Sequence, residues 1–230
     1  MPKLPKLWLA WSSGKDSAWA LHTLRCRGEF EVVALLTTVN HTHARVAMHA
    51  VRESVLQMQA SAVDLPLITV PIPSPCPNEV YEHAMSVAME RARDAGVTHV
   101  AFGDLFLEDI RRYREERLAL CNMTPVFPIW QRDTYALAAE MLAAGLRAIV
   151  TCVDPKRLAP EFAGRVWNEE FVRDLPPGVD PCGENGEFHS FAFSGPMFRA
   201  ALCVRRGEIV TRDGFVFADV LACDSADAAS

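Results

Sequence analysis

The residues best suited to chemistry form a short loop near the N-terminus, at residues 12–17, with the sequence SSGKDS. Small residues let backbone N–H groups approach a phosphate closely, and a helix that begins near Ser17 points the positive end of its dipole at the same place. The serine hydroxyls add hydrogen-bond donors, and Lys15 adds a cation. Asp16 does not suit an anion site, so we interpret it as a Mg²⁺ ligand or a helix cap. The predicted nucleotide-binding residues of this phosphate loop are Ser12, Ser13, Gly14, Lys15, Asp16 and Ser17.

The phosphate loop also has a plainer interpretation, a capped helix that follows a turn, because Ser, Asp and Gly are common in such places. The loop is not a Walker A motif, which needs Gly, four residues and then Gly-Lys-Ser/Thr. It is not the dinucleotide fingerprint either, which needs three spaced glycines. Its position in the first strand-to-helix turn of a parallel sheet favours phosphate binding.

A second candidate, Gly103-Asp104, ends the fourth predicted strand. In an open α/β sheet, ligands bind at the carboxyl ends of the strands where the strand order reverses. If the first and fourth strands are neighbours, Gly103 and Asp104 face the phosphate loop, and Asp104 holds Mg²⁺ or a water bound to it. The alternative, which the sequence favours equally, is an ordinary turn, because Gly-Asp is common in turns. Thr37, in the second predicted strand, is a further candidate for nucleotide binding.

The charged segment at residues 105–115 follows directly. Glu108 and Arg111, at its start, are expected to lie near the nucleotide edge and to bind substrate. The alternative is a solvated helix face, in which Arg111 and Glu115 form an i,i+4 ion pair.

The segment at residues 182–190, CGENGEFHS, gathers polar groups in one short loop. Two glycines bracket a turn that carries Glu184 and Asn185. If the chain is extended after the turn, Glu187 and His189 share one face. Two carboxylates, an amide and an imidazole suit binding of a polar substrate, capture of ammonia or proton transfer. The alternatives are a polar turn with a structural histidine, and a metal site made by the opening cysteine, the second glutamate and the histidine.

The elements that must position these groups alternate between strand and helix. Strands are predicted at residues 7–11, 32–38, 67–72, 97–102 and 148–153, and helices at 17–27, 47–63, 79–95, 109–120 and 134–144, with a short extended piece at 125–130. This alternation predicts βαβ units and a parallel sheet. Shorter β-like runs follow a stretch rich in Pro and Gly, at residues 191–193, 198–204, 208–211 and 215–220.

The predicted fold class is therefore α/β, with an open parallel sheet and a smaller C-terminal α+β lobe. We divide the chain into an ATP-binding domain at 1–126, a substrate-binding lobe at 127–221 and a flexible tail at 222–230. The apolar strands around Phe198 and Phe215 either cover the core of their own lobe or pair across a homodimer.

Composition excludes several classes of protein. Half of the 230 residues are hydrophobic, as in ordinary globular proteins, and a net charge of −6 argues against a nucleic-acid partner. The seven cysteines are scattered without a C-x-x-C pair, which predicts mostly free thiols in a reducing compartment. Neither a signal peptide nor an apolar stretch long enough to cross a membrane is visible, so we expect a cytoplasmic protein.

The phosphate loop resembles the S-G-G-K-D-S signature of the PP-loop ATP pyrophosphatases, with Ser13 in place of the first glycine. A negative φ at Ser13 would make this replacement harmless, whereas a positive φ would strain the serine. Other segments extend the resemblance, over most of the chain, to the diphthine–ammonia ligase family. These segments are residues 103–115, Pro128-Ile129-Trp130, which is similar to a Pro-Leu-Trp motif, and residues 183–188, which carry a Gly-Glu-x-Gly-Glu-aromatic run.

The resemblance implies the adenine nucleotide alpha hydrolase-like fold and an AMP- and pyrophosphate-forming ligase. Such an enzyme binds ATP with Mg²⁺ and adenylates a substrate carboxylate, and ammonia or another amine then displaces AMP. This sequence departs from the family pattern at Asp109, Ile110 and Tyr113, in a segment where the acceptor substrate would be recognised. The compact chain is most similar to the shorter prokaryotic relatives.

The residue chemistry and the family resemblance together give the expected function, its alternatives and the role of each residue. A nucleotide-binding regulatory protein without turnover, and a tRNA-thiolating enzyme, are the alternative functions; missing C-x-x-C pairs and the acidic balance argue against the latter. The expected catalytic residues are Lys15, Asp16, Glu187 and His189; the substrate-binding residues are Glu108, Arg111, Glu184, Asn185 and Glu187; and the Mg²⁺ ligands are Asp16 and Asp104.

Overall fold

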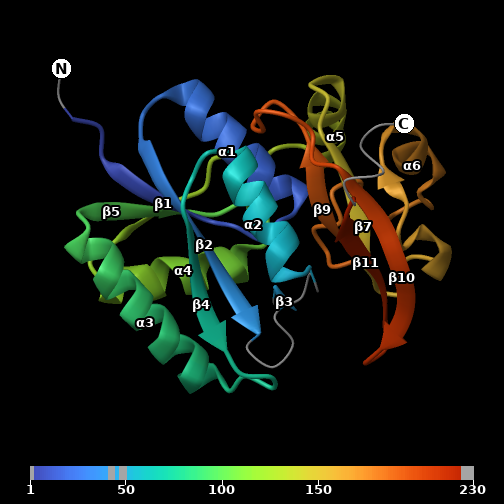
Figure 1. Ribbon diagram of the computed structural model, residues 1–230. Coiled ribbons are helices and arrows are strands. Elements are labelled where there is room, and N and C mark those ends of the chain that lie inside the picture. The colour runs from blue at the N-terminus through green and yellow to red at the C-terminus, as the bar shows by residue number, and fades with distance from the viewer. Residues whose placement is uncertain (1–2, 41–44, 47–50, 224–230) are drawn as a thin grey trace.

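Two β-sheets organise the chain, and two helices lie between them, as the computed structural model in Figure 1 shows. The structure describes residues 3–40, 45–46 and 51–223. The first sheet contains β1 Lys6–Ala10, β2 Glu31–Asn40, β3 Arg45–Val46, β4 Leu67–Ile72, β5 Val97–Ala101 and β6 Thr124–Val126. Its helices are α1 Lys15–Arg27, α2 Glu53–Ala62, α3 Asn78–Asp94 and α4 Glu108–Leu120.

The first sheet is parallel apart from β3, and β1 lies at its centre. β1 pairs with β2 on one side and with β5 on the other. β2 pairs in parallel with β4, and β5 with β6, whereas β3 runs antiparallel to the end of β2. The strand order therefore reverses between β1 and β5, which is where an open α/β sheet binds its ligand.

The four helices cover opposite faces of this sheet. Ala88 and Met89 of α3 and Leu118 of α4 pack in one apolar cluster with Val100 of β5. α1 and α2 pack in another cluster, which continues into the second sheet, with α1 against β9 and α2 against β11. Four consecutive residues of α1, from Ala18 to Leu21, are buried, as expected of a helix covered on more than one side.

The second sheet is antiparallel and is built from the C-terminal third of the chain. β7 pairs with β8, β9 and β11, and β10 pairs with β11. The strands are β7 Arg147–Val153, β8 Val166–Trp167, β9 Phe188–Ser194, β10 Val204–Arg212 and β11 Phe215–Ala222, accompanied by α5 Thr134–Ala143, a 3₁₀ turn at Pro160–Phe162 and α6 Glu169–Asp174.

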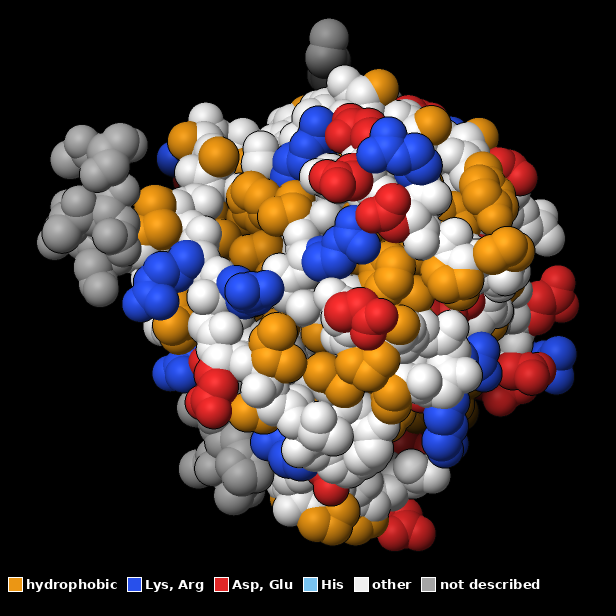
Figure 2. Space-filling model, turned by 90° about the vertical axis from the view of Figure 1, so that its right-hand side faces the viewer, with side chains coloured by type: hydrophobic (Ala, Val, Ile, Leu, Met, Phe, Trp, Pro, Cys, Tyr) orange, Lys and Arg blue, Asp and Glu red, His pale blue; other side chains and the backbone are white. Residues whose placement is uncertain are grey.

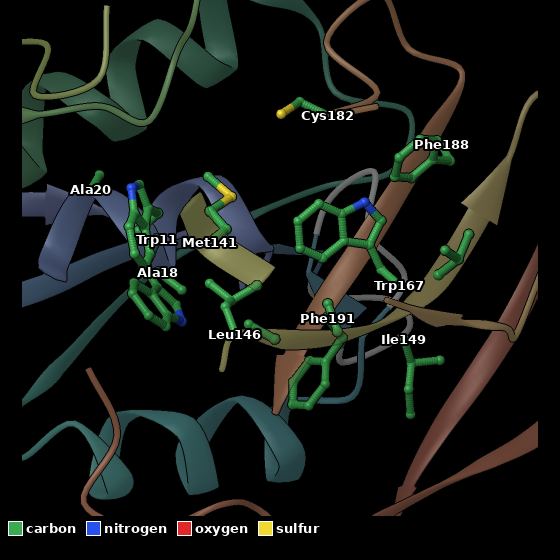
Figure 3. Packing of buried hydrophobic residues seen from close by; sticks show 14 of the residues in the cluster. Trp11, Ala18, Ala20, Met141, Leu146, Ile149, Trp167, Cys182, Phe188 and Phe191 are labelled. Atoms are coloured by element: carbon green, nitrogen blue, oxygen red, sulfur yellow. The ribbon is translucent and has the colours of Figure 1, made fainter. Parts of the chain in front are cut away.

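One continuous core joins the two sheets (Figure 3). Trp11 and Ala18, from the N-terminal part, belong to the same buried cluster as Trp167, Phe188 and Phe191 of the second sheet. The first sheet is consequently packed on both faces, which explains why its central strands have near-continuous apolar sequences.

Several sequence predictions are confirmed and others are wrong. The parallel sheet and the separate C-terminal lobe are both present. The strand expected at 148–153 exists, but as β7 it lies in the antiparallel sheet, because a buried apolar run looks the same at the centre of either kind of sheet. Residues 198–202 have no regular secondary structure, with bends at 198–200, and β10 begins only at Val204. The turn at 128–130 likewise ends the predicted extended piece, since β6 covers only Thr124–Val126.

Two further differences concern α2 and the cysteines. α2 begins at Glu53 because Arg52 has an extended backbone, with φ −66° and ψ 142°; residues 47–50 of the predicted helix lie outside the described residues. Cys203 and Cys223 form a disulfide whose Cα atoms are 5.4 Å apart, whereas five other cysteines are free, as predicted. The hairpin of β10 and β11 brings this pair together, and no local spacing signals it.

Candidate functional site

The phosphate loop lies at the point where the strand order reverses, between the end of β1 and the start of α1. Gly14 is the N-cap of α1 and has no side chain of its own to cap the helix, although Ser190 Oγ accepts from the Lys15 N–H (3.3 Å). Ser12 Oγ accepts from the Gly14 N–H (3.3 Å) and donates to Ser17 Oγ (3.1 Å), which donates to the Gly14 carbonyl (3.0 Å). The hydroxyls thus brace the loop, while the N–H groups of the first turn have no acceptor within the helix. This arrangement suits an anion.

Ser13 has the positive φ that strains a serine, the second of the two outcomes considered for its replacement of glycine. Its φ is +71°, in the left-handed region, and the residue is fully buried. Its Oγ has no hydrogen-bond partner in the described part of the chain. The Ser13 carbonyl is held from two sides, by the N–H of Ala192 and by Nε2 of Gln59, both at 2.9 Å. Strain and an unpartnered buried hydroxyl make this position a candidate for a functional role.

Lys15 is buried beneath the loop instead of reaching into solvent. Only 1% of the residue is exposed, and its Nζ bonds both carboxylate oxygens of Asp16 (3.0 and 2.8 Å) and the Cys182 carbonyl. The ammonium also lies over the rings of Trp167 (5.8 Å) and Phe188 (5.4 Å). Burial lowers the pKa of Lys15, but nearby negative charge, chiefly that of Asp16, raises it more, so the side chain stays a cation.

Gly103 and Asp104 face the phosphate loop, because β5 is the neighbour of β1. A Cβ on Gly103 would lie 2.9 Å from the Asp16 carbonyl carbon and from the Ser17 nitrogen, so only glycine fits. Asp104 pairs with Arg114, whose Nε is 2.6 Å from Asp104 Oδ2.

Glu184 brings the C-terminal lobe to the same place. Its Oε1 accepts a hydrogen bond from the Leu105 N–H (2.8 Å), directly after Gly103-Asp104. Burial raises the pKa of Glu184 to about 7, and the negative charges of Asp16 and Asp104 contribute to the increase, with Lys15 opposing it. Three carboxylates and one cation therefore interact across the site.

Asn185 and Glu187 form hydrogen bonds near their own loop, whereas Ser190 Oγ reaches the phosphate loop and accepts from the Lys15 N–H (3.3 Å). Glu187 is 3% exposed and accepts from the Asp180 N–H (3.2 Å) and from Asn185 Nδ2 (3.1 Å). Burial, with a smaller contribution from the Lys15 charge, lowers the pKa of His189 to about 4, so the imidazole is neutral at pH 7.

The alternative of a metal site in this loop receives no support. Burial raises the pKa of the Cys182 thiol. Among the residues that the structure describes, no group of three or more His, Cys, Asp and Glu side chains could hold a metal ion.

Arg111 lies in an aromatic cradle at the start of α4. Its guanidinium carbon is 4.9 Å from the Phe127 ring centre and 4.8 Å from that of Trp130, and its Nε pairs with Glu115 (2.7 Å). The predicted ion pair is therefore present. It borders a hollow of about 230 Å³ that is lined by Glu108, Arg111, Arg112, Glu115, Trp130 and Gln131.

Thr37 has a structural partner. Its Oγ1 donates to the Trp11 carbonyl (2.6 Å), and the residue is 3% exposed. The contact fixes β1 at the point where the phosphate loop begins.

Sequence reasoning missed two residues of this region. Gln59 is a fully buried amide on the apolar face of α2, and a single polar residue at core spacing was the available signal. Arg114 lies in a segment with many charged residues, and nothing in the sequence distinguishes it from them. It also borders a cavity of about 460 Å³ between α3 and α4, with Tyr81, Phe102 and Tyr113 among the lining residues.

The face that carries the second sheet mixes basic and acidic side chains with scattered apolar groups (Figure 2). No helix in the described ranges combines the length and the apolar character needed to span a bilayer.

Comparison with known proteins gives a consistent result. The family model of the diphthamide synthase N-terminal domain matches residues 6–123, and that of the C-terminal domain matches residues 133–220. A diphthine–ammonia ligase from Bos taurus is 25% identical over 233 residues, which cover 91% of this chain and 86% of the relative. One from Danio rerio is 28% identical over 232 residues, with 91% and 90% covered. Because most of each relative is covered, length does not separate this chain from these animal proteins.

Proposed function

Because the chain belongs to the diphthine–ammonia ligase family, we propose that it is an ATP-dependent ligase that forms AMP and pyrophosphate. In this proposal residues 1–126 bind the nucleotide and residues 127–221 contribute the acceptor site. The observation that carries the proposal is the meeting of the phosphate loop, Gly103-Asp104 and Glu184 where the strand order reverses. Backbone N–H groups at the start of α1 would receive the phosphates, and Gly103 packs directly against the backbone of that turn.

Lys15 would act from beneath the loop. A buried ammonium close to the first turn of α1 stabilises negative charge that develops on the leaving pyrophosphate, because a charge interacts strongly in a site from which water is excluded. Its present partners, Asp16 and the Cys182 carbonyl, hold it there without a ligand.

Two carboxylates of the site would suit a magnesium ion once released from their ion pairs, which join Asp16 to Lys15 and Asp104 to Arg114. Asp16 keeps 24% of its side chain exposed and Asp104 keeps 17%. Mg²⁺ is typically held by one or two carboxylates together with substrate phosphates, so two aspartates suffice. When bound, the ion would neutralise charge on the phosphates. Asp16 and Asp104 are the residues that would hold it.

The acceptor carboxylate would approach from α4. Arg111 is held by two aromatic rings and Glu115, which keeps its planar guanidinium ready for a carboxylate, and Glu108 lines the same hollow. Glu184, with a pKa near 7, is suited to take a proton from ammonium or another amine. Asn185, Glu187 and His189 would shape the loop that presents Glu184.

The test is an assay of the products. The protein is incubated with Mg·ATP, ammonium and candidate carboxylates, and AMP and pyrophosphate are measured. ADP and phosphate as products would contradict cleavage between the α- and β-phosphates. Tight ATP binding without turnover, across a broad panel of carboxylates that includes diphthine-bearing protein, would favour a regulatory nucleotide-binding protein.

A further inference from the structure

One buried amide joins the phosphate loop to both halves of the molecule. Oε1 of Gln59, on α2, accepts a hydrogen bond from Trp11 Nε1 (2.9 Å). Its Nε2 donates to the carbonyls of Ser13 (2.9 Å) and Ala192 (2.6 Å). The Ala192 N–H donates to the same Ser13 carbonyl, so α2, the loop and β9 meet at this point.

The three neighbours of Gln59 require one acceptor and two donors, which is what a primary amide offers. A carboxylate of the same size keeps the acceptor for Trp11 but loses both donors. Methionine keeps the length and loses all three bonds. The chemistry of the amide, and not only its volume, is therefore matched to this place.

We propose that Gln59 is a positioning residue for the nucleotide: it holds Ser13 in its left-handed conformation and so directs the N–H groups of the loop toward the phosphates. The inference rests on the proposed function. Ser13 does not favour a φ of +71°, and its carbonyl is held there by Gln59 and Ala192. Because Ala192 belongs to β9, the second sheet helps to set the shape of the loop.

The decisive variant is Gln59→Glu, and Gln57→Glu is its matched control, an exposed glutamine on the same helix. At pH 8 we expect Gln59→Glu to bind Mg·ATP at least about tenfold more weakly than the wild type, since two donors are lost. At pH 6 a buried glutamate is largely protonated, and its O–H restores one donor, so part of the affinity returns. Each variant is compared with the wild type at the same pH, which cancels the titration of Glu184 and of ATP.

Hydrogen exchange provides a readout that does not depend on ATP. At pH 8, amide exchange in Gln59→Glu should rise at residues 11–17 and in β9, and remain unchanged in β5. If Gln59→Glu does not fold, Gln59→Met, which introduces no charge, takes its place for the exchange and binding measurements.

Two results would overturn the inference: affinity within about twofold of the wild type at pH 8, or exchange that rises uniformly through the chain. If the wild type itself fails to bind Mg·ATP, the proposed function is refuted, and the exchange pattern alone decides the role of Gln59.

Discussion

Glu184 should make the folded protein less stable as the pH rises, and Glu184→Gln should remove this effect. The pKa of Glu184 is about 7 in the folded protein, compared with 4.5 for an ordinary glutamate. A raised pKa means that folding disfavours the charged form, so stability is lost as the pH rises from 4.5 through 7. At 1.36 kcal/mol per unit, the cost at pH 8 reaches about 3 kcal/mol as an upper limit. Glutamine carries no charge and still offers an oxygen to the Leu105 N–H.

The assay is thermal unfolding of both proteins at pH 5 and pH 8. A gain of about 3 kcal/mol corresponds to a rise in Tm of roughly 6–12 °C for a chain of this size. We expect the variant to exceed the wild type clearly at pH 8 and by only about 1 kcal/mol at pH 5, where Glu184 is protonated in the folded protein but largely ionised in the unfolded chain. Glu90→Gln, on an exposed residue of α3, is the control and should give the same small difference at both pH values. A difference between Glu184→Gln and the wild type that does not change with pH would refute this reasoning.

Substitutions at three other positions test the phosphate loop and the glycine that packs against it. Lys15→Ala should abolish AMP formation, measured by chromatography of the nucleotides, and normal turnover would contradict the role of the phosphate loop. Ser13→Gly should raise the free energy of unfolding in urea by about 1 kcal/mol, because glycine accepts the left-handed conformation, whereas Ser13→Ala keeps the strain; equal effects would show that the strain is absent. Gly103→Ala should lower the free energy of unfolding by roughly 1–3 kcal/mol and weaken ATP binding, because the added Cβ would press on the backbone at Asp16. If calorimetry finds the ATP affinity unchanged in this variant, the close approach of Gly103 does not matter for binding.

Local patterns were sufficient for much of the fold. Apolar runs and helical spacing place most strands and helices of the first sheet to within a few residues, because buried strands have continuous apolar sequences and helices have periodic ones; α2, predicted from residue 47 but beginning at Glu53, is the exception. β7 shows where this reasoning fails. Its sequence is as apolar as that of a parallel strand, and only its pairing with β9 and β11 assigns it to the other sheet.

The site was predictable where its chemistry is local and not where it depends on distant contacts. The sequence of the phosphate loop indicates anion binding, and Gly103 fits the loop as the strand order requires. Lys15 was expected to point at the phosphate, yet its Nζ bonds the carbonyl of Cys182, 167 residues away in the sequence. No spacing encodes that contact.

The same distance explains why the loop belongs to both halves of the chain. Ser13 is held by Ala192, Lys15 by Cys182, and Glu184 reaches the segment after β5. The conformation of the phosphate loop, which follows β1, therefore depends on hydrogen bonds from residues in and near β9. Because these contacts meet at the buried amide of Gln59 and at the buried ammonium of Lys15, a shift of the second sheet would change the direction of the loop and the position of its cation together.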